Sequence, residues 1–251
     1  MNSTSRRALI KTGIAAAAGV VGLPAIARIA QRHGMIPPDT GGAFGVGETL
    51  NYATHRLTRN SMAREFPPDK ISAKPFANEL APPSAAFRRL QAGGFADWRL
   101  AIDGIVERPA ALSVAQVKSY PSHSHITLIQ CEEGWSYIAK WTGTQLSHVL
   151  DRVGVHPRAK YVVYFSIEKD WWDSIDLDEA LHPQTLLAYG LNDGELPVAN
   201  GGPLRMRLPR QLGYKNVKFI TRLTVTDDLK KFGKGLGSSS PEQGYAWYAG
   251  I

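Results

Sequence analysis

The chain has 251 residues and a formal net charge of +7, with 43% hydrophobic and 20% charged residues. This composition is typical of a soluble globular protein and excludes a mainly disordered chain, a collagen and a multi-span membrane protein. The basic residues are spread along the chain, so nucleic acid is not an expected partner. The single cysteine excludes an internal disulfide framework, a four-cysteine zinc site and an all-cysteine iron–sulfur cluster.

The first 27 residues predict an export signal. Ser5-Arg6-Arg7 and Lys11 precede an apolar stretch over residues 12–27 that is short and weakly hydrophobic for a membrane-spanning helix. Ala25-Ile26-Ala27 has the small-x-small form of a cleavage site. Paired arginines before such a stretch are typical of the twin-arginine pathway, so we expect a periplasmic protein. An uncleaved amphipathic anchor is the alternative interpretation.

Residues 28–95 are rich in proline and glycine and show little periodicity. Four dipeptides punctuate the segment, namely Pro37-Pro38, Gly41-Gly42, Pro67-Pro68 and Pro82-Pro83. Such pairs mark turns and irregular structure. We therefore expect an extended arm with few regular elements, which packs on the domain formed by residues 96–251.

Residues 96–251 have the pattern of many short strands and few helices. Strands are expected over residues 99–106, 126–130, 161–167, 204–208 and 219–226. Short helices are expected over residues 114–119, 143–153 and 176–181, with Asp176 as the N-cap of the third. The second of these carries apolar residues at helical spacing, and Gly154 can end it. This mixture predicts an α+β domain.

Cys131 follows the short apolar run at 126–130, so it is expected where a buried strand opens into a loop. A buried inert cysteine is one interpretation. A nucleophile is the second, and it requires a histidine base, for which His123 and His125 are near in sequence. A thiolate ligand to a soft metal is the third. One thiolate cannot hold a metal alone, so a cofactor would have to supply the remaining ligands.

Four blocks of sequence occur in a distinctive order around this cysteine. They are Cys131-Glu132-Glu133-Gly134-Trp135-Ser136 with Trp141-Thr142-Gly143 and Leu146; Ser174-Ile175-Asp176-Leu177 with residues 180–185 and 187–189; residues 200–205 with 211–218; and the C-terminal residues 244–251. Together they cover most of residues 98–251 and resemble the sulfite oxidase superfamily, with an ending similar to that of an exported bacterial subgroup. The resemblance implies a strand-rich molybdopterin-binding fold with short helices.

The resemblance also implies a molybdenum centre held by a pterin dithiolene, with Cys131 as the protein ligand and as the catalytic cysteine. The remaining positions that it assigns to the cofactor are Ser166, Asn200, Arg205, Asn216, Val217, Lys218 and, in the arm, Arg64 and Glu65. Arg205 suits a phosphate because its planar fork makes two parallel hydrogen bonds. Lys218 adds a point charge, and the backbone N–H groups of Asn216 and Val217 suit an anion nest.

The expected activity is oxygen-atom or two-electron transfer on an unidentified small substrate. Sulfite is not favoured, because the loop after Cys131 carries the acids Glu132 and Glu133 where a dianion would need arginines. This sequence has no haem-attachment motif and too few cysteines for a cluster, so we expect a separate electron-transfer partner, a cytochrome or a membrane subunit. The alternatives are a binding module without redox turnover and a metal-free cysteine enzyme.

The export hypothesis predicts the fate of an Arg6→Lys/Arg7→Lys variant. Lysine keeps both positive charges but removes the paired guanidinium groups, so the protein should accumulate in the cytoplasm. Cell fractionation with an antibody against the protein measures this, and Arg28→Lys, just beyond the predicted signal, is the matched control. Normal periplasmic accumulation of the double variant would contradict the twin-arginine interpretation.

Overall fold

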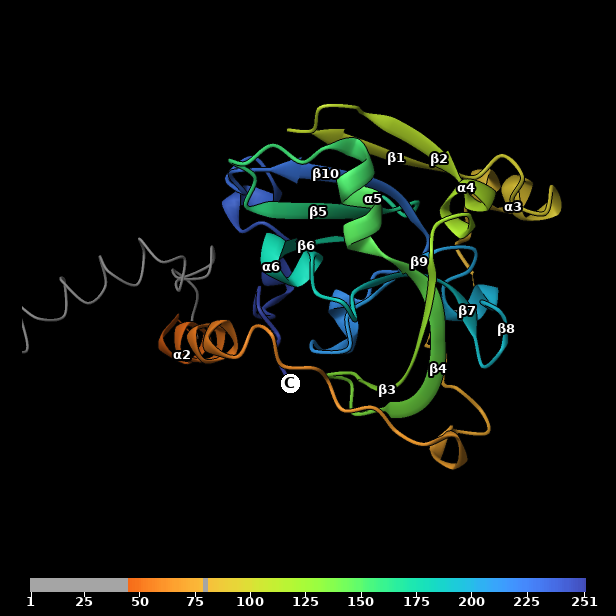
Figure 1. Ribbon diagram of the computed structural model, residues 1–251, viewed down its shortest axis with the longest axis horizontal. Helices are drawn as coiled ribbons and strands as arrows, with labels where there is room; N and C mark the ends of the chain where they lie inside the picture. The colour runs from red at the N-terminus through yellow and green to blue at the C-terminus, as the bar shows by residue number, and fades with distance from the viewer. Residues whose placement is uncertain (1–44, 79–80) are drawn as a thin grey trace, which may run out of the picture.

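The computed structural model describes residues 45–78 and 81–251 of the chain. The predicted export signal over residues 1–27 and the start of the predicted arm lie outside the described residues. Within them, the chain forms two five-stranded sheets and a few short helices (Figure 1). The prediction of a strand-rich, mixed α+β fold is therefore confirmed.

The first sheet has the strand order β2-β1-β10-β5-β6, in which β1 and β10 run parallel and the other neighbours run antiparallel. Its strands are β1 (Arg99–Gly104), β2 (Ala110–Ser113), β5 (Tyr161–Ser166), β6 (Trp172–Asp176) and β10 (Ile220–Thr226). The second sheet has the order β3-β4-β7-β8, and β9 pairs with β7. Its strands are β3 (Ser122–Gln130), β4 (Ser136–Gln145), β7 (Leu186–Leu191), β8 (Gly194–Glu195) and β9 (Arg205–Arg207).

Five α-helices accompany these sheets in the described part of the chain. They are α2 (Gly45–Leu57), α3 (Ala85–Ala92), α4 (Val114–Lys118), α5 (Leu146–Val153) and α6 (Leu177–Ala180). None of them is long and apolar enough to cross a membrane. The predicted cap residues form as expected: Asp176 accepts a hydrogen bond from the Glu179 N–H at the start of α6, and Gly154 ends α5 with a left-handed backbone.

The main core lies where α5 and β7 face the first sheet. The inward face of α5 consists of Leu146, Val149, Leu150 and Val153, all buried. These side chains pack with buried residues of β1, β5, β10, β7 and β9 in one cluster. The apolar burial of this cluster supplies most of the driving force that holds the two sheets together.

The structure corrects one predicted helix boundary and adds elements that the sequence did not indicate. Residues 143–145 are not helical: they finish β4, where a Cβ on Gly143 would lie 2.4 Å from the Leu187 carbonyl oxygen, so the neighbouring strand requires a glycine. The arm contains α2 and α3, which the sequence did not signal because their inward faces carry few apolar residues. Finally, β2, β6, β7, β8 and most of β4 were not predicted from periodicity.

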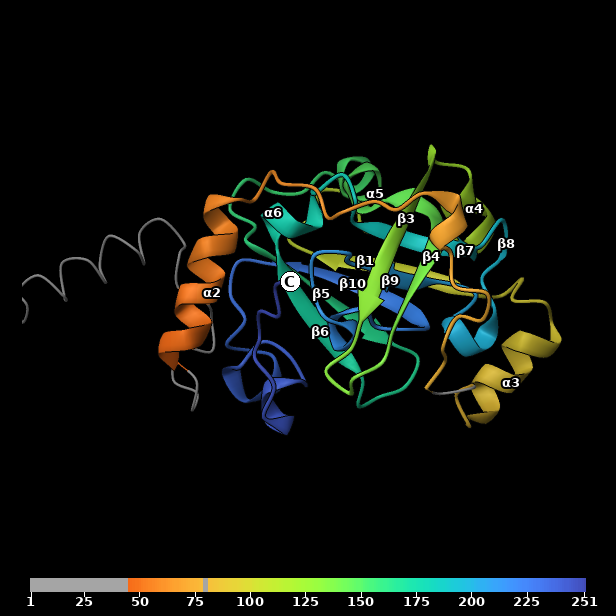
Figure 2. The ribbon, with the colours of Figure 1, turned by 90° about the horizontal axis from the view of Figure 1, so that it is seen from below.

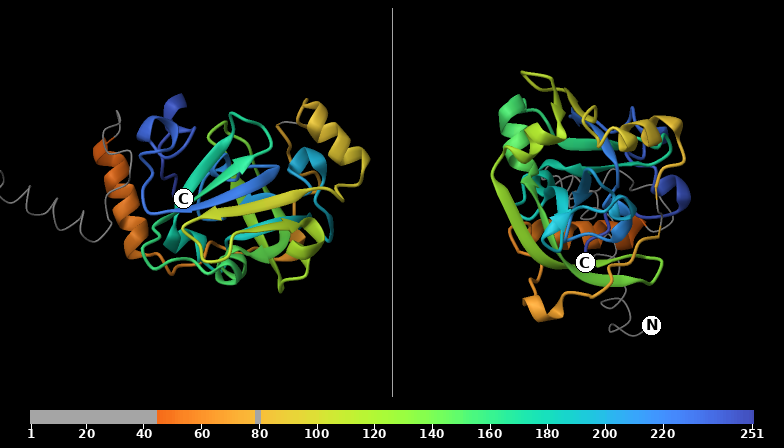
Figure 3. Two further views of the ribbon diagram at one scale, coloured as in Figure 1. Left: turned by 90° about the horizontal axis from the view of Figure 1, so that it is seen from above. Right: turned by 90° about the vertical axis from the view of Figure 1, so that its right-hand side faces the viewer.

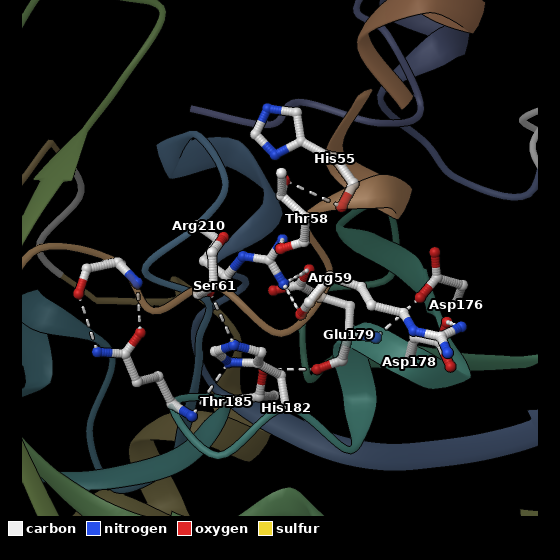
Figure 4. A network of polar contacts seen from close by, with 12 residues as sticks. His55, Thr58, Arg59, Ser61, Asp176, Asp178, Glu179, His182, Thr185 and Arg210 are labelled. Atoms are coloured by element: carbon white, nitrogen blue, oxygen red, sulfur yellow. Dashed lines mark hydrogen bonds and ion pairs between the residues drawn. The ribbon is translucent and has the colours of Figure 1, made fainter. Parts of the chain in front are cut away.

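The arm runs from α2 at one end of the domain towards α3 at the other (Figures 2 and 3). A buried polar network fastens its first part. Arg210 donates a hydrogen bond to the Arg59 carbonyl at 2.8 Å and lies 3.5 Å from the buried carboxylate of Glu179 (Figure 4). The His182 ring contacts the Ser61 carbonyl at 3.2 Å. Burial raises the pKa of Glu179 to about 7, and Arg210 opposes this shift.

A second buried ion pair ties the segment after β9 to the first sheet. The Lys215 ammonium and the Asp173 carboxylate are both fully buried and in direct contact. Lys215 also donates to the Ser174 and Trp247 carbonyls, each at 2.7 Å, and Ser240 donates to Asp173 at 2.9 Å. The short 3-10 helix Gly213–Lys215 is thereby fixed beside the C-terminal segment.

Removing one member of this pair should destabilise the protein strongly. Lys215→Met leaves the Asp173 carboxylate buried without its cation, which typically costs about 3–5 kcal/mol of unfolding free energy. The matched control is Lys118→Met, because Lys118 pairs with the exposed Glu195, and such pairs are worth about 1 kcal/mol or less. Denaturant unfolding monitored by circular dichroism measures both. Equal effects of the two variants would contradict the structural role given to Lys215.

Candidate active site

A pocket of about 420 Å³ opens between the two sheets, and Cys131 lies in its wall. Five segments line it. They are Phe76 and Asn78 of the arm, the loop after β3 with the start of β4 (131–137), the turn 168–171 between β5 and β6, the segment from Asn200 to Lys218, and the C-terminal loop 239–245. Segments far apart in the sequence therefore meet at the single cysteine.

The local backbone holds Cys131 at this position. Its N–H donates to the Trp135 carbonyl at 3.0 Å, and its own carbonyl accepts from the Gly134 N–H at 3.1 Å, so the loop turns tightly after β3. The residue is 6% exposed. A Cβ on Gly213 would lie only 3.1 Å from the Cys131 sulfur. The glycine thus keeps the space beside the sulfur open.

The thiol is not prepared to act as a free nucleophile. Burial and the neighbouring Glu132 raise the pKa of Cys131 to about 12, so the thiol stays protonated at neutral pH unless a cation binds it. No histidine lines the pocket. Instead, His125 contacts Glu65 at 3.1 Å and His123 packs beside His148. The base that a metal-free cysteine enzyme needs is therefore absent from the pocket lining.

Two buried guanidinium groups lie behind the pocket. Arg205 is 3% exposed and donates to the carbonyls of Asn200 and Asn216, each at 2.7 Å. Arg207 is 1% exposed, and its Nε atom has no hydrogen-bond partner within the described structure. Burial and the nearby Arg205 lower the pKa of Arg207 to about 9. Both cations lie about 5 Å from the centre of the Trp141 ring.

Neither guanidinium group forms an ion pair with a carboxylate among residues 45–78 and 81–251. A buried charge without a counter-charge is costly, since the protein interior solvates it poorly. Such a site favours a bound anion next to Arg205, which lines the pocket. Arg207 was not predicted from the sequence, although its position two residues after Arg205 in β9 places both side chains on one face of the strand.

Lys218 and Asn200 lie on the same side of the pocket, and both contact the arm. Lys218 is 5% exposed and donates to the Ala199 carbonyl at 2.9 Å and to the Asn78 side chain at 3.1 Å. Asn200 donates to the Phe76 carbonyl at 3.2 Å. The arm residues Phe76 and Asn78 carry no motif that would have marked them, so the sequence did not reveal their place in the pocket.

Asn216 and Val217 have structural contacts in addition to their place near the pocket. The Asn216 side chain accepts from the Leu208 N–H at 2.7 Å and from Arg207 at 3.1 Å, while its backbone N–H donates to Gly213. The Val217 side chain is fully buried in the main core. Asn216 lines the pocket, whereas Val217 does not.

Three further residues named from the sequence lie outside the pocket lining. Ser166 accepts a hydrogen bond from the Glu168 N–H at 3.1 Å and so shapes the turn whose next residues line the pocket. Arg64 lies over the Phe66 ring, and Glu65 forms a bridge with Thr127 of β3. The structure thus brings together Cys131, Asn200, Arg205, Asn216 and Lys218, but not Ser166, Val217, Arg64 and Glu65.

The donor set fits a metal that arrives with its own ligands. No group of three or more histidine, cysteine, aspartate or glutamate residues suited to a metal ion occurs among the described residues. Cys131 offers one soft sulfur donor, and Gly213 leaves space beside it. Arg205 and Lys218 offer charge for an anionic tail. These features match a metal-carrying pterin with a phosphate.

Comparison with known proteins identifies the class. The family model for the oxidoreductase molybdopterin binding domain matches residues 89–232. The chain belongs to this family. It is therefore a molybdopterin-dependent oxidoreductase of the sulfite oxidase superfamily, and its cofactor is a molybdenum-bound pterin.

The chain is also similar in sequence to two curated proteins. The chain is 35% identical over 191 residues to the putative protein-methionine-sulfoxide reductase subunit YedZ1 of Azospira oryzae, covering 76% of this chain and 69% of that protein. It is 33% identical over 169 residues to the protein-methionine-sulfoxide reductase catalytic subunit MsrP of Xanthomonas campestris, covering 61% and 52%. The chain thus spans about half to two thirds of the length of these relatives.

A solved structure shows the same fold. The crystal structure of the sulfane dehydrogenase SoxCD from Paracoccus pantotrophus superposes with a TM-score of 0.51 at 22% identity, and the match covers 53% of this chain and 39% of that one. At 22% sequence identity, this similarity is evidence for the fold alone.

The geometry predicts that Arg205→Ala lowers cofactor occupancy. The substitution removes a buried guanidinium group, and charge-assisted hydrogen bonds to an anion are worth about 1.5–3 kcal/mol, so affinity should fall by about tenfold or more. Pterin fluorescence after oxidation and molybdenum content per chain are the measurements. Arg222→Ala is the matched control, since Arg222 pairs with Asp103 at the surface. Full pterin content in Arg205→Ala would remove this residue from the cofactor site.

Proposed function

We propose that this chain is the catalytic part of an exported reductase that acts on sulfoxides, with methionine sulfoxide as the substrate class and Cys131 as the protein ligand to molybdenum. The observation that carries the proposal is the position of Cys131, buried in the pocket wall with open space beside its sulfur. The names of the two curated relatives supply the substrate class.

Each of these pocket residues has its own role in the proposal. Arg205 and Lys218 hold the phosphate of the cofactor, and Asn200 holds a polar edge of the pterin. Cys131 would bind the metal as a thiolate, because a bound cation would lower the thiol pKa that burial and Glu132 raise. When bound, the cofactor supplies oxygen-atom and two-electron transfer.

The overall reaction converts a sulfoxide, two electrons and two protons into a thioether and water. The chain orients the sulfoxide and limits the access of bulk water. Trp135 and Trp171 line the pocket and provide apolar surface for a thioether. The Trp135 indole is held by its hydrogen bond to Glu133 at 2.6 Å and by the Phe76 ring, whose centre lies 4.9 Å away.

The electrons enter from a separate protein in this proposal. The sequence contains one cysteine and no Cys-x-x-Cys-His motif, so a cytochrome or membrane subunit would supply the electrons. The words "subunit" and "catalytic subunit" in the names of the relatives are consistent with such an assembly. The twin-arginine motif supports export to the periplasm, where methionine residues of exposed proteins are open to oxidation.

The proposal predicts that Cys131→Ser abolishes turnover. Serine preserves the size but replaces a soft sulfur donor with a normally protonated hydroxyl, so reduction of methionine sulfoxide with an artificial electron donor should fall by about 100-fold or more. Pterin content should change less, because Arg205 and Lys218 remain. The thermal unfolding midpoint, compared with that of Ser136→Ala at the start of β4, controls for folding.

Two outcomes would contradict the proposal. Retained activity in a molybdenum-replete Cys131→Ser protein would exclude the ligand role of the thiol. A molybdenum-replete wild-type protein that reduces no sulfoxide would exclude the substrate class, and turnover of another substrate in the same preparation would leave the ligand role in place.

A further inference from the structure

The pocket shows a marked separation of charge with depth. Its buried cations, Arg205 and Lys218, are 3% and 5% exposed. Four carboxylates line the same pocket closer to solvent, namely Glu132, Glu133, Glu168 and Asp170. Only one further cation, Lys169, occurs in the lining. The floor is therefore positive and the entrance, called here the acidic rim, is negative.

Three of the four carboxylates of this rim keep their negative charge without a basic partner among the described residues. Within the described residues, Glu132, Glu133 and Asp170 form no ion pair. Glu133 accepts hydrogen bonds from the neutral donors Trp135 and Asn78, which leave its charge in place. The two acids after Cys131 and the two in the turn 168–171 come from different sheets, yet they line one pocket.

Aromatic side chains line the same entrance. Trp135 and Trp171 line the pocket, as do Tyr214 and Tyr245, whose rings stack with centres 5.1 Å apart. Tyr245 is 38% exposed and so presents its ring to solvent. Aromatic faces next to carboxylates favour ammonium and guanidinium groups, which gain both Coulomb and cation–π attraction. The entrance thus has the chemistry that recognises cationic chains.

We infer that the acidic rim selects the substrate by charge: the protein acts preferentially on sulfoxides carried in lysine- or arginine-rich peptide segments and discriminates against anionic ones. This inference rests on the proposed function and specifies its substrate class. An approaching polypeptide meets the rim before it reaches the cations of the floor, because the cations are buried and are engaged by the cofactor phosphate. The charge of the segment therefore governs its rate of capture.

The selection of substrate by charge is tested by measuring kcat/KM for two matched peptides. Both have blocked ends and a central methionine sulfoxide, flanked on each side by two lysines in one peptide and by two glutamates in the other. The molybdenum-replete enzyme should show a kcat/KM about tenfold higher for the lysine peptide at low ionic strength. The ratio should shrink in 0.5 M salt, where the screening length falls to about 4 Å.

The variant Glu168→Gln/Asp170→Asn should move the ratio of the two kcat/KM values towards one. The matched control is Asp97→Asn/Asp151→Asn, which changes the net charge equally at two exposed positions outside the pocket and should keep the wild-type ratio. The substitutions are placed at Glu168 and Asp170 so that Glu132 and Glu133, which follow Cys131 directly, remain unchanged.

The outcomes separate the inference from the proposed function. Equal kcat/KM values for both peptides, or a ratio that the control variant lowers as much as the rim variant, would overturn the selection by charge while leaving sulfoxide reduction in place. Failure of the molybdenum-replete enzyme to reduce either peptide or a small neutral methyl sulfoxide would overturn the proposed function, and the inference with it.

Discussion

The site depends on positive charge that the protein buries without a carboxylate partner among its described residues. Arg205 and Arg207 are almost fully buried, contact one tryptophan ring, and satisfy most of their donors with carbonyl and side-chain oxygens. Two other buried cations behave differently, since Lys215 pairs with Asp173 and Arg210 with Glu179. Arg205 and Arg207 instead lie at and behind the pocket that contains Cys131, where a bound phosphate can offset their charge.

Both ends of the described chain help to build this pocket. The arm brings Phe76 and Asn78 onto Asn200 and Lys218, and the polar network around Arg210 fastens the start of the arm to the domain. The C-terminal loop 239–245 lines another part of the pocket, and the Lys215 ammonium group donates a hydrogen bond to the carbonyl of Trp247, just after that loop. Because these irregular segments line the pocket beside Cys131, they help to determine the shape of the site.

Much of the secondary structure could be predicted where residue spacing, cap residues and β-branched runs indicate the same element. The apolar spacing of α5, the cap residue Asp176 and the β-branched run of β5 identified their elements. The position of Cys131 after a buried strand followed from the apolar run at 126–130. Its place in one pocket with Arg205 and Lys218 followed from the family resemblance instead. The strand β7, buried along its whole length, lacks the alternation of a half-exposed strand and was missed. Arm residues such as Phe76 were missed because only tertiary contacts place them in the pocket.

The proposed role of this site requires that the Cys131 sulfur ligates the molybdenum of the cofactor. X-ray absorption at the molybdenum edge of the purified, metal-replete protein tests it most directly, since the method counts the sulfur atoms bound to the metal. If Cys131 is this ligand, the wild type has one more sulfur ligand than the pterin dithiolene supplies, and metal-replete Cys131→Ser lacks that one sulfur. An identical sulfur count in the wild type and in the variant would contradict it.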